Sequence, residues 1–205
     1  MISVTGRPDI DELLTHEPLA LLIAMLLDQQ VPLERAFSAP FDLKERLGGS
    51  LDAATIAAMD PDEFVAIFSA KPALHRFPAA MAERVQRLAQ IVVDAYGGDA
   101  GEVWRSAPDG RALLNVNNTL PGFGLQKAQI FVALLAKQLG VRPSGWEQAA
   151  GVFGETGAFI SVADIDSPES LLKVRAHKQA MKAAARAAAG EEPVKARKAP
   201  PKRSS

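Results

Sequence analysis

The chain has 205 residues, of which 48% are hydrophobic and 23% are charged, a balance typical of globular proteins. It contains no cysteine, which excludes disulfides, thiolate zinc sites and a cysteine-held iron–sulfur cluster. The net charge of −1 conceals an asymmetry: residues 173–205 carry ten Lys or Arg and two Glu, whereas the remaining chain carries 13 basic and 22 acidic residues. A basic end on an acidic body favours a polyanionic partner, and the alternative is a solvated, disordered terminus.

No segment has the pattern of a membrane span or an export signal. The longest apolar run, LALLIAMLL at residues 19–27, is too short to cross a bilayer and predicts a buried helix. The start MISVTGRPDI lacks the basic region and apolar core of a signal peptide. We therefore expect a cytoplasmic protein without a membrane partner, and the absence of cysteine fits a reducing compartment.

Helix-start signals recur along the first part of the chain. Pro18 stands at the first turn of the apolar segment, and Pro32 has the same position before LERAF. The run Asp60-Pro61-Asp62-Glu63 has the form of an N-cap, a first-turn proline and a capping-box acid. We find neither the alternation of a strand nor a solenoid repeat, so the sequence predicts an all-α fold.

Two longer helices are predicted further along. Residues 78–96 place one apolar face at helical spacing, and Gly97-Gly98 ends this helix; the face comprises Met81, Val85, Leu88, Ile91, Val92 and Tyr96. Ser167-Pro168-Glu169 begins a last helix that we expect to run to about Ala189. Residues 190–205 have three prolines and no apolar periodicity. We expect a helical body at 1–160, a helical segment at 161–189 and a disordered basic tail at 190–205.

The run LPGFGLQKAQIF at 120–131 predicts a tight turn between two helices. The first helix is expected at 110–118 and the second at 125–140, with Ala128, Phe131, Val132, Leu135 and Leu139 facing inward. Pro121 fixes φ, while Gly122 and Gly124 allow unusual φ values and close backbone approach. The turn ends at a helix N-terminus, where free N–H groups and the helix dipole favour an anion. The alternative is an ordinary helix corner.

Three segments, in this order, resemble the HhH-GPD superfamily, the base-excision DNA glycosylases related to endonuclease III. L-P-G-F-G-x-x-K-A at 120–128 is similar to the helix-hairpin-helix motif of that family. Residues 18–37 resemble its early helix with a Gln-containing loop, and residues 68–99 resemble its basic turn and long helix. The resemblance covers roughly residues 10–160. It implies an all-α, two-lobed fold with a DNA-binding cleft between the lobes, and a nucleoid-associated location.

The resemblance also implies specific roles. Its partner would be double-stranded DNA, intact or damaged, and its hairpin would hold a DNA phosphate, which makes the candidate DNA-binding residues Leu120, Pro121, Gly122, Phe123, Gly124, Gln126 and Lys127. It implies a monovalent cation at the hairpin carbonyls and no other cofactor or metal. Gln30 matches the side chain that fills the space left by a flipped nucleotide, and its alternative is a polar helix end in solvent.

Both of the family's catalytic positions carry other residues here. Gln126 stands where bifunctional members have a lysine that forms a Schiff base with the sugar. Lys127 lies one residue on, about 100° around a helix, so we expect it to point elsewhere. By the family's spacing the catalytic aspartate falls at 144–146, which read Ser, Gly and Trp, and Ser144-Gly-Trp-Glu147 has the form of a capping box. Glu147 is the nearest acid and the candidate catalytic residue, with a capping-box partner as its alternative.

We therefore expect a DNA-binding member of this superfamily without standard glycosylase or lyase catalysis. One alternative is an active monofunctional glycosylase that hydrolyses the N-glycosidic bond of a damaged base with an atypical acid. Another is a protein-interaction module on a relic fold. A carboxylate directed into the cleft near the hairpin would favour the enzyme, and a cleft with positive potential and no acid would favour the binder. The predicted cations are Lys127, Lys137, Arg142 and the tail.

Overall fold

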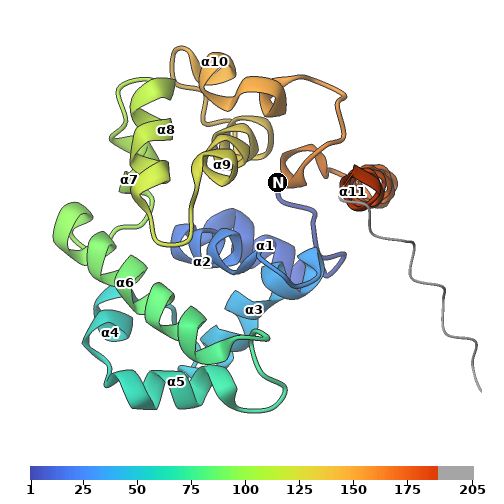
Figure 1. The fold of residues 1–205 in the computed structure, drawn as a ribbon. Coiled ribbons are helices and arrows are strands. Elements are labelled where there is room, and N and C mark those ends of the chain that lie inside the picture. Colours follow the sequence, from blue (N-terminus) through green and yellow to red (C-terminus); the bar gives the residue numbers. More distant parts are fainter. Residues whose placement is uncertain (189–205) are drawn as a thin grey trace, which may run out of the picture.

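The computed structural model describes residues 1–188 and confirms an all-α fold, with no strand in that range. The first helices are α1 (Pro8–His16), α2 (Pro18–Leu27), α3 (Leu33–Arg46), α4 (Ala53–Ala58), α5 (Pro61–Ser69) and α6 (Pro78–Tyr96). They are followed by α7 (Glu102–Arg105), α8 (Gly110–Thr119), α9 (Leu125–Gln138), α10 (Trp146–Ala150), the 3-10 helices η1 (Gly151–Gly154) and η2 (Val162–Asp164), and α11 (Pro168–Ala188). A lower lobe of α3 to α6 and an upper lobe of α7 to α10 flank α1 and α2 (Figure 1).

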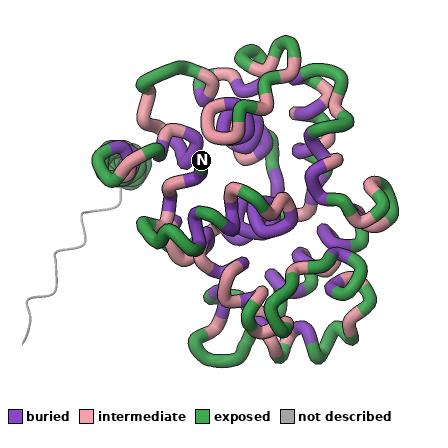
Figure 2. Tube along the Cα trace, turned by 180° about the vertical axis from the view of Figure 1, so that it is seen from behind, coloured by how far each residue is buried: buried purple, intermediate pink, exposed green. Residues whose placement is uncertain are grey.

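The apolar helix α2 lies at the centre of the molecule, between the two lobes. All nine residues from Leu19 to Leu27 are buried, and the tube in Figure 2 is continuously purple there. Because α2 has neighbours on every side, it has no polar face, which explains the uninterrupted apolar run in the sequence. Burial of a leucine or isoleucine side chain contributes about 1.5–3 kcal/mol, so the apolar residues of α2 contribute strongly to the stability of the core.

Most predicted helix ends are confirmed. Pro18 opens α2, and the carboxylate of Asp60 accepts hydrogen bonds from the backbone N–H groups of Asp62 and Glu63 at the start of α5. Gly97 takes a left-handed conformation and ends α6. Pro32 differs slightly from expectation, because it is the N-cap of α3 and not a first-turn residue.

The capping box predicted at 144–147 is wrong. Helix α10 begins at Trp146, its N-cap is Gly145 with φ +73°, and no side chain caps it. The capping box in this part of the chain is formed by Ser161 and Asp164 around η2 instead. A glycine in the left-handed region directs the chain into α10 without help from the Ser144 hydroxyl.

The hairpin pairs α8 with α9, and the inward face predicted for α9 is largely confirmed, since Ala128, Phe131, Val132 and Leu135 are buried and Leu139 is half-buried. The last helix, α11, packs on the body only near its beginning, where Ser170 and Val174 are buried, and is exposed beyond it (Figure 2).

The predicted disordered tail at 190–205 and the expected helix end at Ala189 lie outside the described residues. Within residues 1–188, no helix combines the length and apolar character needed to cross a bilayer.

Candidate nucleic-acid interface

The hairpin turn packs against the C-terminal end of α2 at Gly122. Gly122 has φ +77°, and a Cβ atom on it would lie 3.4 Å from Cγ of Leu26 and 3.5 Å from Nε2 of Gln29, which are ordinary van der Waals distances. The turn is closed by a hydrogen bond from the Phe123 N–H to the Leu120 carbonyl at 3.0 Å. Of the two roles expected of a hairpin glycine, the positive φ is therefore confirmed at Gly122, whereas the packing would accommodate a Cβ atom.

The same expectation is wrong for Gly124. Its φ is −96°, which any residue adopts, and a Cβ atom there would meet nothing within 4 Å. Gly124 is the N-cap of α9, and no side chain caps this helix. The first N–H groups of α9 therefore lack an intrahelical partner, and the Cβ position of Gly124 beside them is open.

The candidate hairpin residues divide into two groups. Leu120 and Phe123 are buried, and the Phe123 ring stands edge-on to Phe131 with centroids 5.8 Å apart, so both residues hold the turn from inside. Pro121 is half-buried, whereas Gly122, Gly124 and Gln126 are exposed. Any ligand of this hairpin therefore meets the exposed backbone of the turn and the Gln126 side chain.

Lys127 lies at the joint between the hairpin and α2. Its Nζ atom donates a hydrogen bond to the Leu26 carbonyl at 3.2 Å and lies 5.7 Å from the centre of the Phe123 ring. Burial lowers the pKa of Lys127 to about 8; the charge of Asp28 opposes this shift and that of Arg84 adds to it. A buried ammonium with a lowered pKa is a more reactive amine than a surface lysine.

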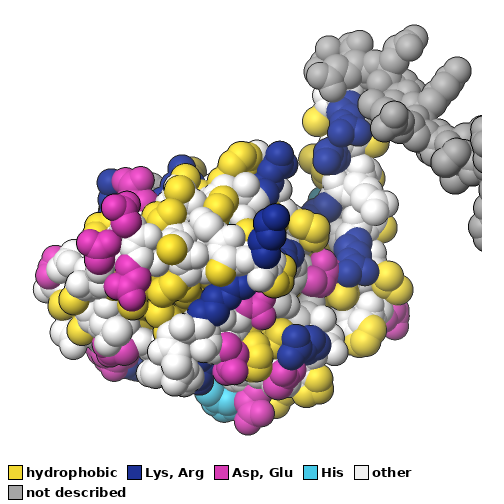
Figure 3. Space-filling model, turned by 90° about the horizontal axis from the view of Figure 1, so that it is seen from below, with side chains coloured by type: hydrophobic (Ala, Val, Ile, Leu, Met, Phe, Trp, Pro, Cys, Tyr) yellow, Lys and Arg dark blue, Asp and Glu magenta, His cyan; other side chains and the backbone are white. Residues whose placement is uncertain are grey.

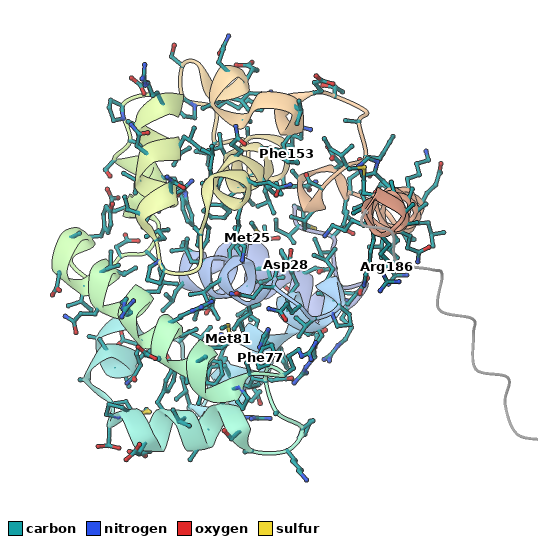
Figure 4. All side chains as sticks on the ribbon, viewed as in Figure 1. Met25, Asp28, Phe77, Met81, Phe153 and Arg186 are labelled. Carbon is teal, nitrogen blue, oxygen red and sulfur yellow. The ribbon has the colours of Figure 1, made fainter. Side chains whose placement is uncertain are left out.

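A cavity of about 210 Å³ brings together residues from α2, α9, η2 and α11, namely Met25, Asp28, Gln126, Lys127, Ile130, Ser161, Val162 and Lys178. Met25 and Asp28 lie between the upper lobe and α6 in Figure 4. Lys127 and Gln126 both line this cavity, but Nζ of Lys127 is held at the Leu26 carbonyl, whereas Gln126 is exposed. The cavity holds one carboxylate, Asp28, and two ammonium groups.

The sequence analysis did not single out Ser161, which is one of the residues that line the cavity with Gln126. Ser161 is 1% exposed and caps η2. It follows α10 and η1 in the chain, beyond the positions 144–146 at which spacing placed the family's acid. The signal that could have found it is the Ser-x-x-Asp capping pattern of 161–164.

The structure does not bring Glu147 to the cavity. The Ser144 carbonyl accepts a hydrogen bond from the Gly110 N–H at 2.8 Å, so this segment lies at the start of α8. The hairpin turn follows the opposite end of α8, ten residues on, or ~15 Å along a helix axis. Glu147 is exposed in the first turn of α10.

The loop after α2 presents Gln30 to solvent. Gln30 is exposed and has φ +56°, a strained conformation for a residue with a side chain. Its neighbour Gln29 is fixed: Nε2 donates to the Leu26 carbonyl at 2.7 Å, and Oε1 accepts from Nη1 of Arg84 at 2.9 Å. The loop is thus rigid at Gln29 and exposed at Gln30, which suits a side chain that enters another molecule.

His75 connects this loop to the start of α6. Its Nδ1 accepts a hydrogen bond from the Phe77 N–H at 3.1 Å, which leaves Nε2 as the protonated nitrogen that donates to the Gln29 carbonyl at 2.9 Å. Burial lowers the pKa of His75, with Arg76 and Lys127 adding to the shift against the two backbone contacts. Phe77 is 42% exposed with the Arg76 guanidinium 4.8 Å over its ring, an exposed aromatic that the sequence analysis missed.

Two of the predicted sources of positive charge line the cavity, namely Lys127 and Lys178, which belongs to the basic C-terminal region 173–205. The other two predicted cations have partners elsewhere, since Lys137 forms an ion pair with Asp164 at 2.6 Å and Arg142 donates to the Ala136 carbonyl. Arg84, which was not predicted, binds the Gln29 side chain. In the range 1–188, His, Asp and Glu side chains form no group of three or more suited to a metal ion.

Comparison with known proteins agrees with this arrangement. No curated protein matches the chain. A family model described as HhH-GPD superfamily base excision DNA repair protein matches residues 23–195. The match includes most of α2, the Gln30 loop, the hairpin and the η2 segment, and it covers well over half of the sequence. The chain therefore belongs to the HhH-GPD superfamily of base excision DNA repair proteins.

Proposed function

We propose that this protein binds double-stranded DNA through the hairpin turn, with the N–H groups at the start of α9 on one phosphate and Gln30 entering the duplex. Gly124 carries the proposal. Its φ is ordinary and its Cβ position meets no atom of residues 1–188 within 4 Å, so nothing in that range requires a glycine there. A phosphate approaching the α9 N-terminus does require that space.

The turn also fits the monovalent cation that the family implies. Peptide carbonyl oxygens are suitable hard ligands for an alkali cation. Within residues 1–188, the turn carbonyls of Gly122 and Phe123 accept no backbone hydrogen bond, whereas the Leu120 carbonyl accepts one from the Phe123 N–H. A cation held by Gly122 and Phe123 would add a positive charge beside the phosphate position.

The positions expected for the family's catalytic pair carry neither a lysine nor an aspartate. Gln126 stands at the position expected for the Schiff-base lysine, and Ser144 at the position expected for the aspartate. The leading proposal is therefore a protein that binds intact or damaged DNA without standard glycosylase or lyase chemistry. A relic that binds only proteins has less support, because the cavity is open and carries two lysines against one acid.

One observation favours an active enzyme as the second candidate. Asp28 lines the cavity beside Lys127, so a carboxylate does face the cleft near the hairpin. A carboxylate at this place can stabilise the positive charge that develops on the sugar as the N-glycosidic bond breaks, or can activate water. In this alternative the atypical acid is Asp28 and not Glu147.

The test combines DNA binding with release of free base. Duplexes carrying uracil, an alkylated purine, an oxidised purine or an abasic-site mimic are titrated at two salt concentrations, and the same mixtures are assayed for released base. The variants are Gly124→Ala, Asp28→Asn and Glu147→Gln. The leading proposal predicts salt-sensitive binding that Gly124→Ala weakens, with no base released.

The outcomes separate the candidates. Base release that Asp28→Asn abolishes establishes the enzyme and overturns the leading proposal, while loss in Glu147→Gln alone restores the acid expected from the sequence. Binding that Gly124→Ala leaves unchanged shows that the hairpin is not the phosphate site.

A further inference from the structure

The basic residues of α11 divide into an ion-paired group and a free group. Lys173 is paired with Glu169 at 2.7 Å and lies 4.6 Å over the Phe159 ring. Arg175 is paired with Glu34 of α3. Among residues 1–188, no acidic partner lies within ion-pair distance of the other three, which are Lys178, Lys182 and Arg186. We call these three the α11 basic stripe.

The part of α11 that bears the stripe leaves the body. Val174 is 1% exposed, whereas residues 178–187 are all exposed. Lys and Arg side chains follow the length of this projecting helix in Figure 3, and Arg186 lies near its end in Figure 4. Beyond Lys178, which lines the cavity, this exposed helical segment presents its charges to an external partner.

The stripe has a regular geometry. Its members are four residues apart, so they share one side of the helix at steps of ~6 Å and span ~12 Å. Like charges at this spacing repel and weaken the helix unless a polyanion neutralises them. Lys178, the first member, lines the cavity with Gln126 and Lys127, so the stripe begins at the hairpin and leads away from it.

The apolar residues of α11 argue against a membrane surface as the partner. Leu172 and Met181 are both exposed, at 62% and 59%, but they are nine residues apart and therefore on opposite sides of the helix. A helix that lies in a membrane interface needs one continuous apolar face, which this arrangement does not provide.

We propose that the α11 basic stripe is a second DNA contact, which binds backbone phosphates of the duplex that extends beyond the hairpin. This inference rests on the proposed function, because the hairpin must first place the DNA. The stripe recognises charge and spacing and not base sequence. It gives an acidic protein a basic track that continues the interface from the cavity outward.

The test is the salt dependence of DNA binding in the full chain. The stripe variant is Lys178→Gln/Lys182→Gln/Arg186→Gln, in which glutamine retains good helix propensity. The control, Arg105→Gln/Arg111→Gln/Arg142→Gln, removes the same charge from exposed upper-lobe residues away from the hairpin. Because Arg105 is paired with Asp99 and Glu102 and Arg142 donates to the Ala136 carbonyl, thermal unfolding checks that the control variant remains folded. Each phosphate contact contributes about 0.9 to the slope of log K against log salt, so the stripe variant should lose about 2–3 of slope and at least about tenfold in affinity at low salt.

A second readout uses duplex length. On a duplex that covers the hairpin alone, the stripe variant and the native chain should bind equally, and the difference should appear on a longer duplex. The inference is overturned if the stripe and control variants have the same salt slope, or if the stripe variant binds anionic vesicles less tightly and DNA as before. If Gly124→Ala does not weaken binding, the hairpin proposal alone is overturned. If the protein binds no DNA at all, both proposals are overturned.

Discussion

The Nζ atom of Lys127 lies 3.2 Å from the Leu26 carbonyl oxygen and so joins the hairpin helix α9 to the C-terminal end of α2. The same oxygen accepts a hydrogen bond from the Gln29 side chain at 2.7 Å. One carbonyl therefore holds the hairpin and the loop that presents Gln30 in a fixed relation. Two parts of the proposed DNA interface, which are far apart in the sequence, form one rigid unit.

Replacing Lys127 tests whether this lysine lowers the stability of the fold while it supports DNA binding. The pKa of Lys127 is about 8 in the native state, against 10.5 for an unperturbed lysine. The native state therefore favours the neutral amine, and the free energy of unfolding is highest above pH 10.5 and decreases as the pH falls through 8. Lys127→Met should therefore raise the free energy of unfolding at pH 7 by about 1–3 kcal/mol and less at pH 10, while it weakens DNA binding. Denaturant titrations at both pH values measure this.

The exposed Lys178→Met is the matched control, and its stability should stay within about 0.5 kcal/mol of the native chain. An equal loss of stability in Lys127→Met at both pH values would show that the hydrogen bond to Leu26 outweighs the burial of charge.

The two hairpin glycines should respond differently to alanine. Gly122→Ala forces a side chain into a left-handed conformation beside Leu26 and should lower stability by about 1–2 kcal/mol. Gly124→Ala meets no atom and should leave stability unchanged or raise it by up to about 1 kcal/mol. Thermal unfolding and DNA binding are measured on both variants. A stable Gly124→Ala protein with full DNA affinity contradicts a phosphate at this position.

His75 should make the Gln30 loop sensitive to acid. Its native pKa is lowered by burial from a usual value near 6.5, so the neutral form stabilises the fold above that pH, and this stability is lost as the pH falls below it. Protonation of Nδ1 also removes the acceptor of the Phe77 N–H. The native chain should lose stability and DNA affinity between pH 7 and pH 5 more steeply than His75→Gln does.

At pH 7 the His75→Gln variant should be less stable by about 1–2 kcal/mol, because two hydrogen bonds are disturbed. Parallel pH profiles of the two proteins are the measurement, and identical slopes would remove His75 as the cause.

Asn117 is an internal polar group that should destabilise the hairpin. It is fully buried in α8, and within the described part of the chain neither its amide nitrogen nor its oxygen has a hydrogen-bond partner. An unsatisfied buried amide costs about 1–3 kcal/mol, so Asn117→Leu should raise stability by about 1–2 kcal/mol. The exposed neighbour gives the control, Asn118→Leu, which should have no such effect. Loss of stability in Asn117→Leu would mean that the site has no room for an apolar side chain.

The sequence by itself determined the helices and the family. Apolar periodicity located α6 and α9 to within a few residues, Asp60 and Gly97 acted as the expected caps, and Leu120–Gly124 formed the expected turn. These features depend on contacts between residues that are near in the chain, and their local chemistry is nearly independent of the rest of the protein.

Only the tertiary structure decided which side chains share the cavity. Spacing pointed to Ser144 and Glu147, but their segment lies at the far end of α8, whereas Ser161 lines the cavity with Gln126. Lys127 lines the same cavity, and its Nζ atom is held at the Leu26 carbonyl of α2. The position of Lys178 at the cavity likewise follows only from the packing of α11 on the body. A cleft is made of residues from separate helices, and their relative positions follow from packing of the whole core, which no local pattern encodes.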